Sequence, residues 1–347
     1  MKNNAKKTKK LLPLAVLLAA AALLGILLAV LTRSSTDAAD TTIPLCSFTA
    51  EEIDRLAYSG NNMDVTLLKG STGDWMLDSD PALPLDQEKV TSLVEQYAAL
   101  AALRKLEGSD LAELPEKSAA PQMTITIGAG DKTLALTVDQ LNAVADVYYV
   151  YDESGAAYTV MRSDLATLSK SPRDLYKAQT LTDKTLSDVA AMQVNDLQFT
   201  QTDGSWTLTD DPDYPVSQSS IKKMASTILQ MQTAWTVTAP EADTAYGLDS
   251  PDVTAVLTFT DGTSLTVRFG NAVAAAADGS DGDSLCYLAS DAAPTVVYEV
   301  NADSKLAYAV TKESLYEETA TAETAASDPV AQYPVGGEDD YADSLPE

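Results

Sequence analysis

The chain has 347 residues, of which 45% are hydrophobic, and its 51 acidic residues outnumber 23 basic ones to give a net charge of −28. A surface this acidic repels phosphate, which excludes nucleic-acid binding. The sequence contains no histidine. This excludes the commonest general base and the Ser/His and Cys/His nucleophile pairs, so an enzyme would have to use carboxylates, lysine or tyrosine.

The first element predicted along the chain is a membrane-spanning helix. Residues 11–31 form an uncharged apolar run, and a basic segment at residues 1–10 with five lysines precedes it. As a helix the run spans about 31 Å, close to the thickness of a bilayer core. The basic flank predicts a single-pass protein of the cell membrane, with its N-terminus cytoplasmic and the bulk of the chain extracellular. The alternative is a cleaved secretory signal, although its apolar region is usually shorter.

After a polar linker at residues 32–49, a tryptophan motif occurs twice. The sequence TGDWMLDSDP begins at residue 72 and DGSWTLTDDP begins at residue 203, so Trp75 and Trp206 lie 131 residues apart. Apolar residues alternate on both sides of a turn in each copy, which predicts a hairpin of short strands. We expect both tryptophans to be buried against the helix that follows.

Each motif is followed by a helical pattern and further strands in the same order. Apolar residues recur at helical spacing over residues 86–106 and 217–233, and Asp86 and Ser217 are placed to cap the two helices. A proline then starts a hairpin, two more strands follow, and a Leu-Tyr pair closes each copy. The shared order predicts that one folded unit is duplicated.

The predicted fold class is therefore α+β: an N-terminal transmembrane helix, two tandem and mainly antiparallel α+β units, and a disordered acidic tail. The first unit is expected to cover residues 50–180 and the second unit residues 185–317, each with one main helix over a sheet. Residues 318–347 are expected to be disordered, because the chain from Glu317 onward carries nine acidic and no basic residues.

Several of these segments resemble a bacterial family known as domain of unknown function 4340. The resemblance rests on DGSWTL at residue 203, on YGLDSP at residues 246–251, on TFTDGTSLTVRFG and on the closing VYEV. It covers roughly residues 50–317 in two tandem copies and is best in the second unit. The first unit lacks the Tyr-Gly-Leu sequence, so its equivalent turn must be built differently.

The resemblance implies an accessory role. Members of this family are membrane-anchored and resemble components found beside ABC-type transport systems related to gliding-motility exporters. A permease or auxiliary subunit of such a transporter is therefore the implied partner. A shared fold alone assigns no function.

Few residues offer chemistry of their own. Asp278, Asp281 and Asp283 supply hard oxygen ligands at close spacing and are weak candidates for a calcium site. Their spacing does not fit an EF-hand loop, so a solvated loop is favoured. No catalytic residue, cofactor-binding residue or cofactor is predicted. Cys46 and Cys286 are interpreted as free thiols in preference to a disulfide between them.

Two functional hypotheses follow. The favoured one is a membrane-anchored, extracytoplasmic, non-catalytic protein that binds a membrane protein partner of an ABC-type transport system. The alternative is an extracytoplasmic enzyme or ligand-binding protein that acts on cell-envelope polymer through carboxylates. The missing histidine and the duplicated scaffold favour the first hypothesis.

Overall fold

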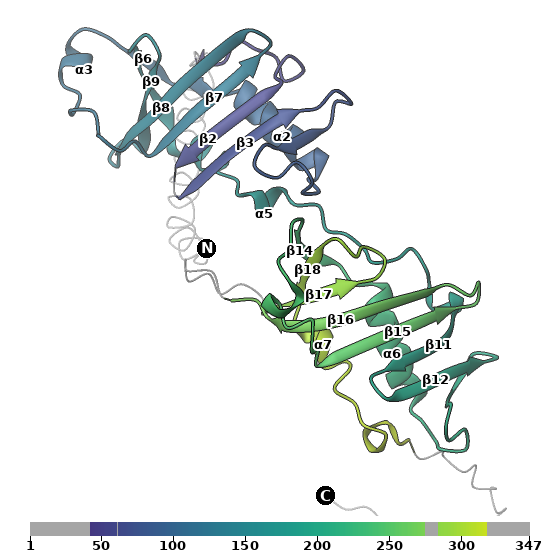
Figure 1. Cartoon of the computed structure of the whole chain (residues 1–347). Helices are drawn as coiled ribbons and strands as arrows, with labels where there is room; N and C mark the ends of the chain where they lie inside the picture. The colour runs from purple at the N-terminus through teal and green to yellow at the C-terminus, as the bar shows by residue number, and fades with distance from the viewer. Residues whose placement is uncertain (1–41, 61, 275–283, 318–347) are drawn as a thin grey trace, which may run out of the picture.

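The computed structural model describes residues 42–60, 62–274 and 284–317. Two eight-stranded antiparallel sheets form the framework of these residues, and they lie end to end with one main helix behind each (Figure 1). The predicted transmembrane segment at residues 11–31 and the predicted acidic tail at residues 318–347 lie outside the described residues.

The first sheet has the strand order β4-β3-β2-β7-β8-β9-β10-β6. Alternation of apolar and polar residues produces its strands: β7 buries Met123, Ile125 and Ile127 and turns the threonines between them outward. The short strands β1 (Ile43–Pro44) and β5 (Ala101–Ala102) pair with each other outside this sheet. The other elements of the first unit are β2 (Arg55–Gly60), β3 (Met63–Lys69), β4 (Trp75–Leu77), α2 (Gln87–Ala98), β6 (Arg104–Leu106), α3 (Ser109–Ala112), β7 (Met123–Ala129), β8 (Lys132–Asn142), β9 (Val147–Asp152), β10 (Ala157–Met161), α4 (Arg162–Ala166) and α5 (Pro172–Leu175).

The second sheet repeats the order of the first, as β13-β12-β11-β15-β16-β17-β18-β14. Every strand of the first sheet thus has a counterpart at the same place in the second, and all neighbouring pairs are antiparallel. The elements of the second unit are η1 (Leu186–Asp188), β11 (Val189–Val194), β12 (Leu197–Thr202), β13 (Ser205–Leu208), α6 (Gln218–Leu229), β14 (Thr233–Val237), η2 (Asp243–Ala245), β15 (Val253–Phe259), β16 (Ser264–Ala272), β17 (Leu285–Ser290), β18 (Val297–Asn301), α7 (Asp303–Leu306) and η3 (Glu313–Leu315).

The helices α2 and α6 complete two separate hydrophobic cores. Asp86 and Ser217 cap them with side-chain oxygens that accept backbone N–H groups, as the sequence predicts. Trp75 and Trp206 are buried in the same cores as the apolar faces of the helices, which confirms their predicted burial. The helix residues that enter the cores are Val90, Leu93, Val94 and Tyr97 in α2, and Ile221, Met224, Ala225, Ile228 and Leu229 in α6.

The predicted α+β fold class is wrong for the described part of the chain, which is mostly β. Both main helices end early, α2 at Ala98 instead of residue 106 and α6 at Leu229 instead of residue 233. The apolar spacing continues past each helix because the next residues also bury apolar side chains. After α2 these are Ala102 in β5 and Leu106 in β6, and after α6 it is Met231, just before β14. The other α-helices in the described residues have at most five residues.

The prediction of a single-pass transmembrane protein is also corrected. Among the described residues, no helix is both long enough and apolar enough to cross a membrane. The apolar run at residues 11–31, on which the prediction rested, lies outside them.

Candidate functional site

Polar and aromatic side chains from distant parts of the chain meet where the first unit joins the second. Helix α5 ends the first unit and lies between the two sheets (Figure 1). Ser171 caps this helix and forms a capping box with Asp174, while Pro172 fits the first helical turn. The turn places Arg173 and Tyr176 against the second unit. We call the following residues the junction: Arg173, Tyr176, Thr233, Trp235, Thr236 and Glu299.

The charged part of the junction is a two-pronged ion pair. Arg173 Nη1 lies 2.9 Å from Glu299 Oε2, and Arg173 Nη2 lies 3.1 Å from Glu299 Oε1. The Glu299 side chain is only 6% exposed, whereas that of Arg173 is 52% exposed. The guanidinium carbon also lies 4.7 Å from the centre of the Trp235 ring. A buried carboxylate requires such a partner, and a planar guanidinium supplies both charge and geometry.

The aromatic part of the junction is Tyr176. Its hydroxyl lies 2.6 Å from Thr233 Oγ1 and 2.7 Å from Thr236 Oγ1, and its ring centre lies 5.3 Å from that of Trp235. The backbone continues this contact, because Thr233 N donates to the carbonyl of Gln179 at 3.0 Å. The chain leaving the first unit is thereby bonded to the beginning of β14.

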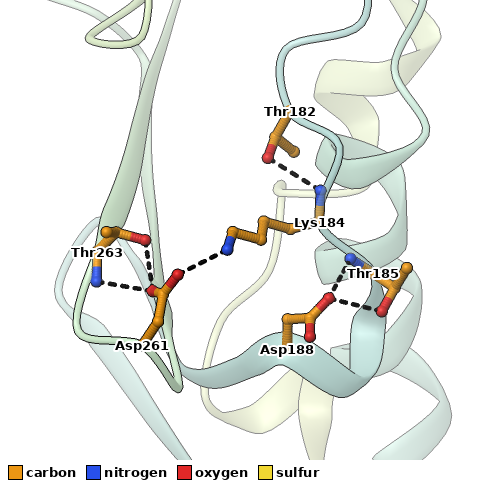
Figure 2. Close-up of polar contacts among 6 residues, drawn as sticks. All are labelled: Thr182, Lys184, Thr185, Asp188, Asp261 and Thr263. Atoms are coloured by element: carbon orange, nitrogen blue, oxygen red, sulfur yellow. Dashed lines mark hydrogen bonds and ion pairs between the residues drawn. The ribbon is translucent and has the colours of Figure 1, made fainter.

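Figure 2 shows how the chain is held to the second sheet after the junction. Lys184 Nζ lies 2.6 Å from Asp261 Oδ2 in the turn between β15 and β16, and Asp261 Oδ1 accepts hydrogen bonds from Thr263 N and Oγ1. The Lys184 ammonium and Thr263 hold the pKa of Asp261 well below its ordinary value, and Asp261 raises the pKa of Lys184. Hydrogen bonds from Thr185 lower the pKa of Asp188 in the same way.

The Tyr-Gly-Leu turn of the second unit packs on the outer face of its sheet. Asn271 N donates to the Tyr246 carbonyl at 2.8 Å, and a Cβ on Gly270 would lie 2.2 Å from that oxygen, so the approach requires a glycine. Leu248 is buried beneath the turn, and the Tyr246 ring meets Tyr287 edge-on at 4.8 Å. The Tyr-Gly-Leu motif, on which the family resemblance was best, therefore packs the turn against the sheet.

The first unit builds the equivalent turn with different chemistry, as its sequence predicts. Asp139 follows the buried Val138 of β8, as Gly270 follows the buried Phe269 of β16. Instead of a close backbone approach, both carboxylate oxygens of Asp139 accept the backbone N–H of Ser118, at 3.2 and 3.1 Å. Lys117 Nζ then lies 3.8 Å from the centre of the Tyr151 ring.

A groove with a volume of about 230 Å³ lies beside the turn of the second unit, lined in part by Pro240 and Val296. Its charged groups already have partners. Arg268 Nη1 lies 2.9 Å from Asp243 Oδ2 and 2.6 Å from the Leu248 carbonyl, and Asp291 Oδ1 accepts Thr266 N at 2.8 Å. These contacts hold the turn and the β17–β18 loop on the sheet.

Three buried tyrosines, side chains of a type that could act as acids, serve a structural role instead. The hydroxyls of Tyr58, Tyr97 and Tyr308 donate to backbone carbonyls at 2.6, 3.1 and 2.8 Å. Burial raises the pKa of all three phenols far above the ordinary value. They stay neutral at physiological pH and act as fixed hydrogen-bond donors.

The calcium candidates Asp278, Asp281 and Asp283 lie outside the described residues. Within the described ranges, no group of three or more Cys, Asp or Glu side chains is placed to hold a metal ion. Cys46 and Cys286 are free and buried, and burial raises the pKa of both thiols. Neither thiol has the lowered pKa that makes a cysteine reactive at neutral pH.

The sequence reasoning missed the junction. The closing Leu-Tyr pair was noted as a repeat marker, yet Arg173 and Glu299 are 126 residues apart and nothing in the pattern links them. The signal available in the sequence was Trp235, a large aromatic residue that stands between Thr233 and Thr236.

The geometry can be compared with known proteins. A family model described as domain of unknown function (DUF4340) matches residues 75–205, whereas no curated protein and no solved structure matches the chain. The match runs from Trp75 in β4 to Ser205 in β13, that is, from the tryptophan hairpin of the first unit to that of the second. It does not extend over the Tyr246 turn, and it shows neither tandem copies nor an association with a transporter. Residues 75–205 are thus similar to the DUF4340 family, in agreement with the resemblance seen in the sequence.

Proposed function

We propose that this protein is a non-catalytic accessory module that binds a protein partner. The junction is the observation that carries this proposal. It bonds two sheets of equal topology through Arg173, Tyr176 and Glu299, so that the surfaces of both units keep a fixed relation. A scaffold fixed before binding loses less conformational freedom on association, which favours docking of another macromolecule.

The state of the ionisable groups supports a binding role over catalysis. Lys184 with Asp261, and Arg268 with Asp243, form ion pairs that hold turns in place. Local hydrogen bonds lower the pKa of Asp188 and Asp261. General acid–base catalysis at neutral pH works best with a carboxyl group whose pKa is raised toward the working pH, and the pKa values of Asp188 and Asp261 are shifted in the opposite direction.

The partner that we propose is a permease or auxiliary subunit of an ABC-type transport system, on the outer side of the membrane. Its support is the association that the family resemblance implies. The high negative charge of the chain agrees with a soluble surface that avoids anionic headgroups.

The test is crosslinking of the full-length chain in intact cells, followed by identification of the captured proteins. We expect a transporter subunit to be captured by the wild-type protein and less of it by Arg173→Ala, which removes the part-buried ion pair of the junction. Arg162→Ala is the matched control, because Arg162 forms an exposed pair with Asp146 at 3.8 Å. Turnover of cell-envelope polymer that is abolished by replacing one Asp or Glu, with no transporter subunit captured, contradicts the proposal.

A further inference from the structure

Each unit ends in a short segment held by the same backbone contacts; we call residues 173–177 the first hook and residues 313–317 the second hook. In the first unit, Asp86 N donates to the Leu175 carbonyl at 2.8 Å and Lys177 N donates to the Pro84 carbonyl at 2.9 Å. In the second unit, Ser217 N donates to the Leu315 carbonyl at 2.7 Å and Glu317 N donates to the Pro215 carbonyl at 3.0 Å. Tyr176 and Tyr316 therefore leave their units from equivalent positions.

The two hook tyrosines differ in burial. Tyr176 is 6% exposed because it is docked on Trp235 of the second unit. Tyr316 is 54% exposed, and its ring meets Tyr214 of its own unit edge-on at 5.8 Å. The second hook thus presents to solvent the aromatic side chain that the first hook buries.

The surface that receives the first hook also has a counterpart in the first unit. Trp235 faces Glu299 across β14 and β18, and Arg104 faces Thr159 at the same end of the first sheet, across β6 and β10. Trp235 lies 131 residues after Arg104, the same separation as the two buried tryptophans. We call Leu103, Arg104 and Lys105 the acceptor of the first unit.

The acceptor is accessible and basic. Leu103 is 44% exposed, and the side chains of Arg104 and Lys105 are 62% and 45% exposed. Arg104 pairs with Asp110 at 2.9 Å and Lys105 pairs with Glu107 at 3.4 Å. Exposed pairs of this kind contribute little free energy, so a partner can replace them.

The second hook and the acceptor of the first unit carry charges opposite to those of the first hook and of Glu299 at the junction. The first hook carries Arg173 three residues before its tyrosine, and this cation meets Glu299. The second hook carries Glu313 at that place and Glu317 directly after the tyrosine. The acidic second hook is therefore complementary in charge to the basic acceptor of the first unit. Within the chain, the basic Arg173 of the first hook is complementary to Glu299 of the second unit in the same way.

We propose that the second hook of one copy docks on the acceptor of a second copy, so that copies associate head to tail. Tyr316 would contact Leu103, and Glu313 and Glu317 would face Arg104 and Lys105. Such a contact uses two different surfaces, so it extends into a ring or an open chain and does not close as a two-fold dimer. This goes beyond the proposed function and does not depend on it.

The competing occupant of the acceptor is the chain's own segment before Thr42. Strand β1 pairs with β5 close to the acceptor, and the sequence before it contains Asp37 and Asp40. The experiment must therefore distinguish contacts between copies from contacts within one copy.

The first test mixes two preparations of the full-length chain, Leu103→Cys and Ser314→Cys, with a short bismaleimide crosslinker. These substitutions keep every charge of the hook and acceptor, and the native thiols are buried. We expect crosslinked species that contain one copy of each variant. Lys222→Cys, on the exposed face of α6, replaces Ser314→Cys in the control and should give none. Yields equal to that control overturn the proposal, as does efficient crosslinking of Leu103→Cys with Asp37→Cys inside one chain.

The second test reverses charges and follows self-association by sedimentation at low salt. We expect Arg104→Glu/Lys105→Glu to weaken association at least about tenfold, because like charges then face each other. Mixing this variant with Glu313→Lys/Glu317→Lys should restore association between the two. Unfolding curves of each variant check that the fold is kept. Association unchanged by reversal, or not restored by the complementary pair, contradicts the head-to-tail contact.

Discussion

At the scale of single residues, Trp206 is one of the largest fully buried side chains of the second core. It is buried among the apolar residues of α6 and its sheet, and its indole Nε1 finds no hydrogen-bond partner among the described residues. We expect Trp206→Ala to lower the free energy of unfolding by about 3–5 kcal/mol. Trp206→Phe should cost less, because it keeps a ring and removes the unpaired donor. Denaturant unfolding measures both, and an unchanged midpoint for Trp206→Ala would place the residue outside the core.

Asp261 links a single residue to the pH dependence of stability. Its pKa in the folded protein lies below the unfolded value, owing to the Lys184 ammonium and Thr263. Its contribution is therefore complete above the unfolded value of about 3.9 and is lost as pH falls through the folded pKa. We expect Asp261→Asn to lower the melting temperature at pH 6 and to reduce the loss of stability between pH 5 and pH 2. A variant with the wild-type acid profile would show that the pair with Lys184 contributes nothing.

At the scale of elements, a glutamine at the start of each main helix completes the edge of a sheet. Gln87 Oε1 accepts Trp75 N at 2.7 Å and its Nε2 donates to the Trp75 carbonyl at 3.0 Å. Gln218 makes the same two contacts with Trp206, at 2.8 and 2.7 Å. The side-chain amide thus pairs with a backbone N–H and C=O as a neighbouring strand would.

Removing this amide leaves two backbone groups of a part-buried edge strand unpaired. We expect Gln87→Ala to lower the free energy of unfolding by about 1–3 kcal/mol. Gln96→Ala is the control, because Gln96 lies in the same helix and its side chain is exposed. Urea denaturation of the two variants measures the difference. Equal losses would mean that the Trp75 backbone finds water in place of the amide.

The sequence predicted the elements better than their ends. Caps at Asp86 and Ser217 and the burial of both tryptophans follow from local rules about helix starts and alternating strands. The ends of α2 and α6 do not, because a buried apolar residue after each helix, Ala102 in β5 and Met231 just before β14, continues the apolar spacing of that helix. Residues assigned to helix therefore belong to strands β5 and β6 and to the start of β14, and each unit keeps one 12-residue helix against an eight-stranded sheet, so the fold is mostly β.

The junction lay beyond sequence reasoning for a different reason. Arg173 and Glu299 come from different units, and their pairing depends on how the two sheets pack, which no local pattern encodes. Comparison of the two units does not reveal the pair either, because Thr159 occupies in the first unit the position that Glu299 occupies in the second.

At the scale of the whole molecule, equal topology does not mean equal chemistry. The outer turn depends on Gly270 in one unit and on Asp139 in the other, while both sheets keep the same strand order. The hooks also differ in charge between the two units, because the first hook presents Arg173 and the second hook presents Glu313 and Glu317. Repeated backbone contacts preserve the fold, and the side chains placed on them determine what each end of the molecule can bind.

The ion pair of Arg173 with Glu299 joins the first unit to the second. Arg173→Ala leaves the Glu299 carboxylate buried without its counter-charge. Because the Arg173 side chain is half exposed, water screens part of the interaction, and we expect a loss of about 1–3 kcal/mol in the free energy of unfolding. Arg162→Ala, in an exposed pair, should cost less.

Replacing both partners, as Arg173→Ala/Glu299→Leu, should recover part of the loss in the free energy of unfolding, since the destabilising element is the unpaired charge. Denaturant unfolding of the four proteins measures these differences. If the double variant is less stable than Arg173→Ala, Glu299 stabilises the junction through contacts other than Arg173.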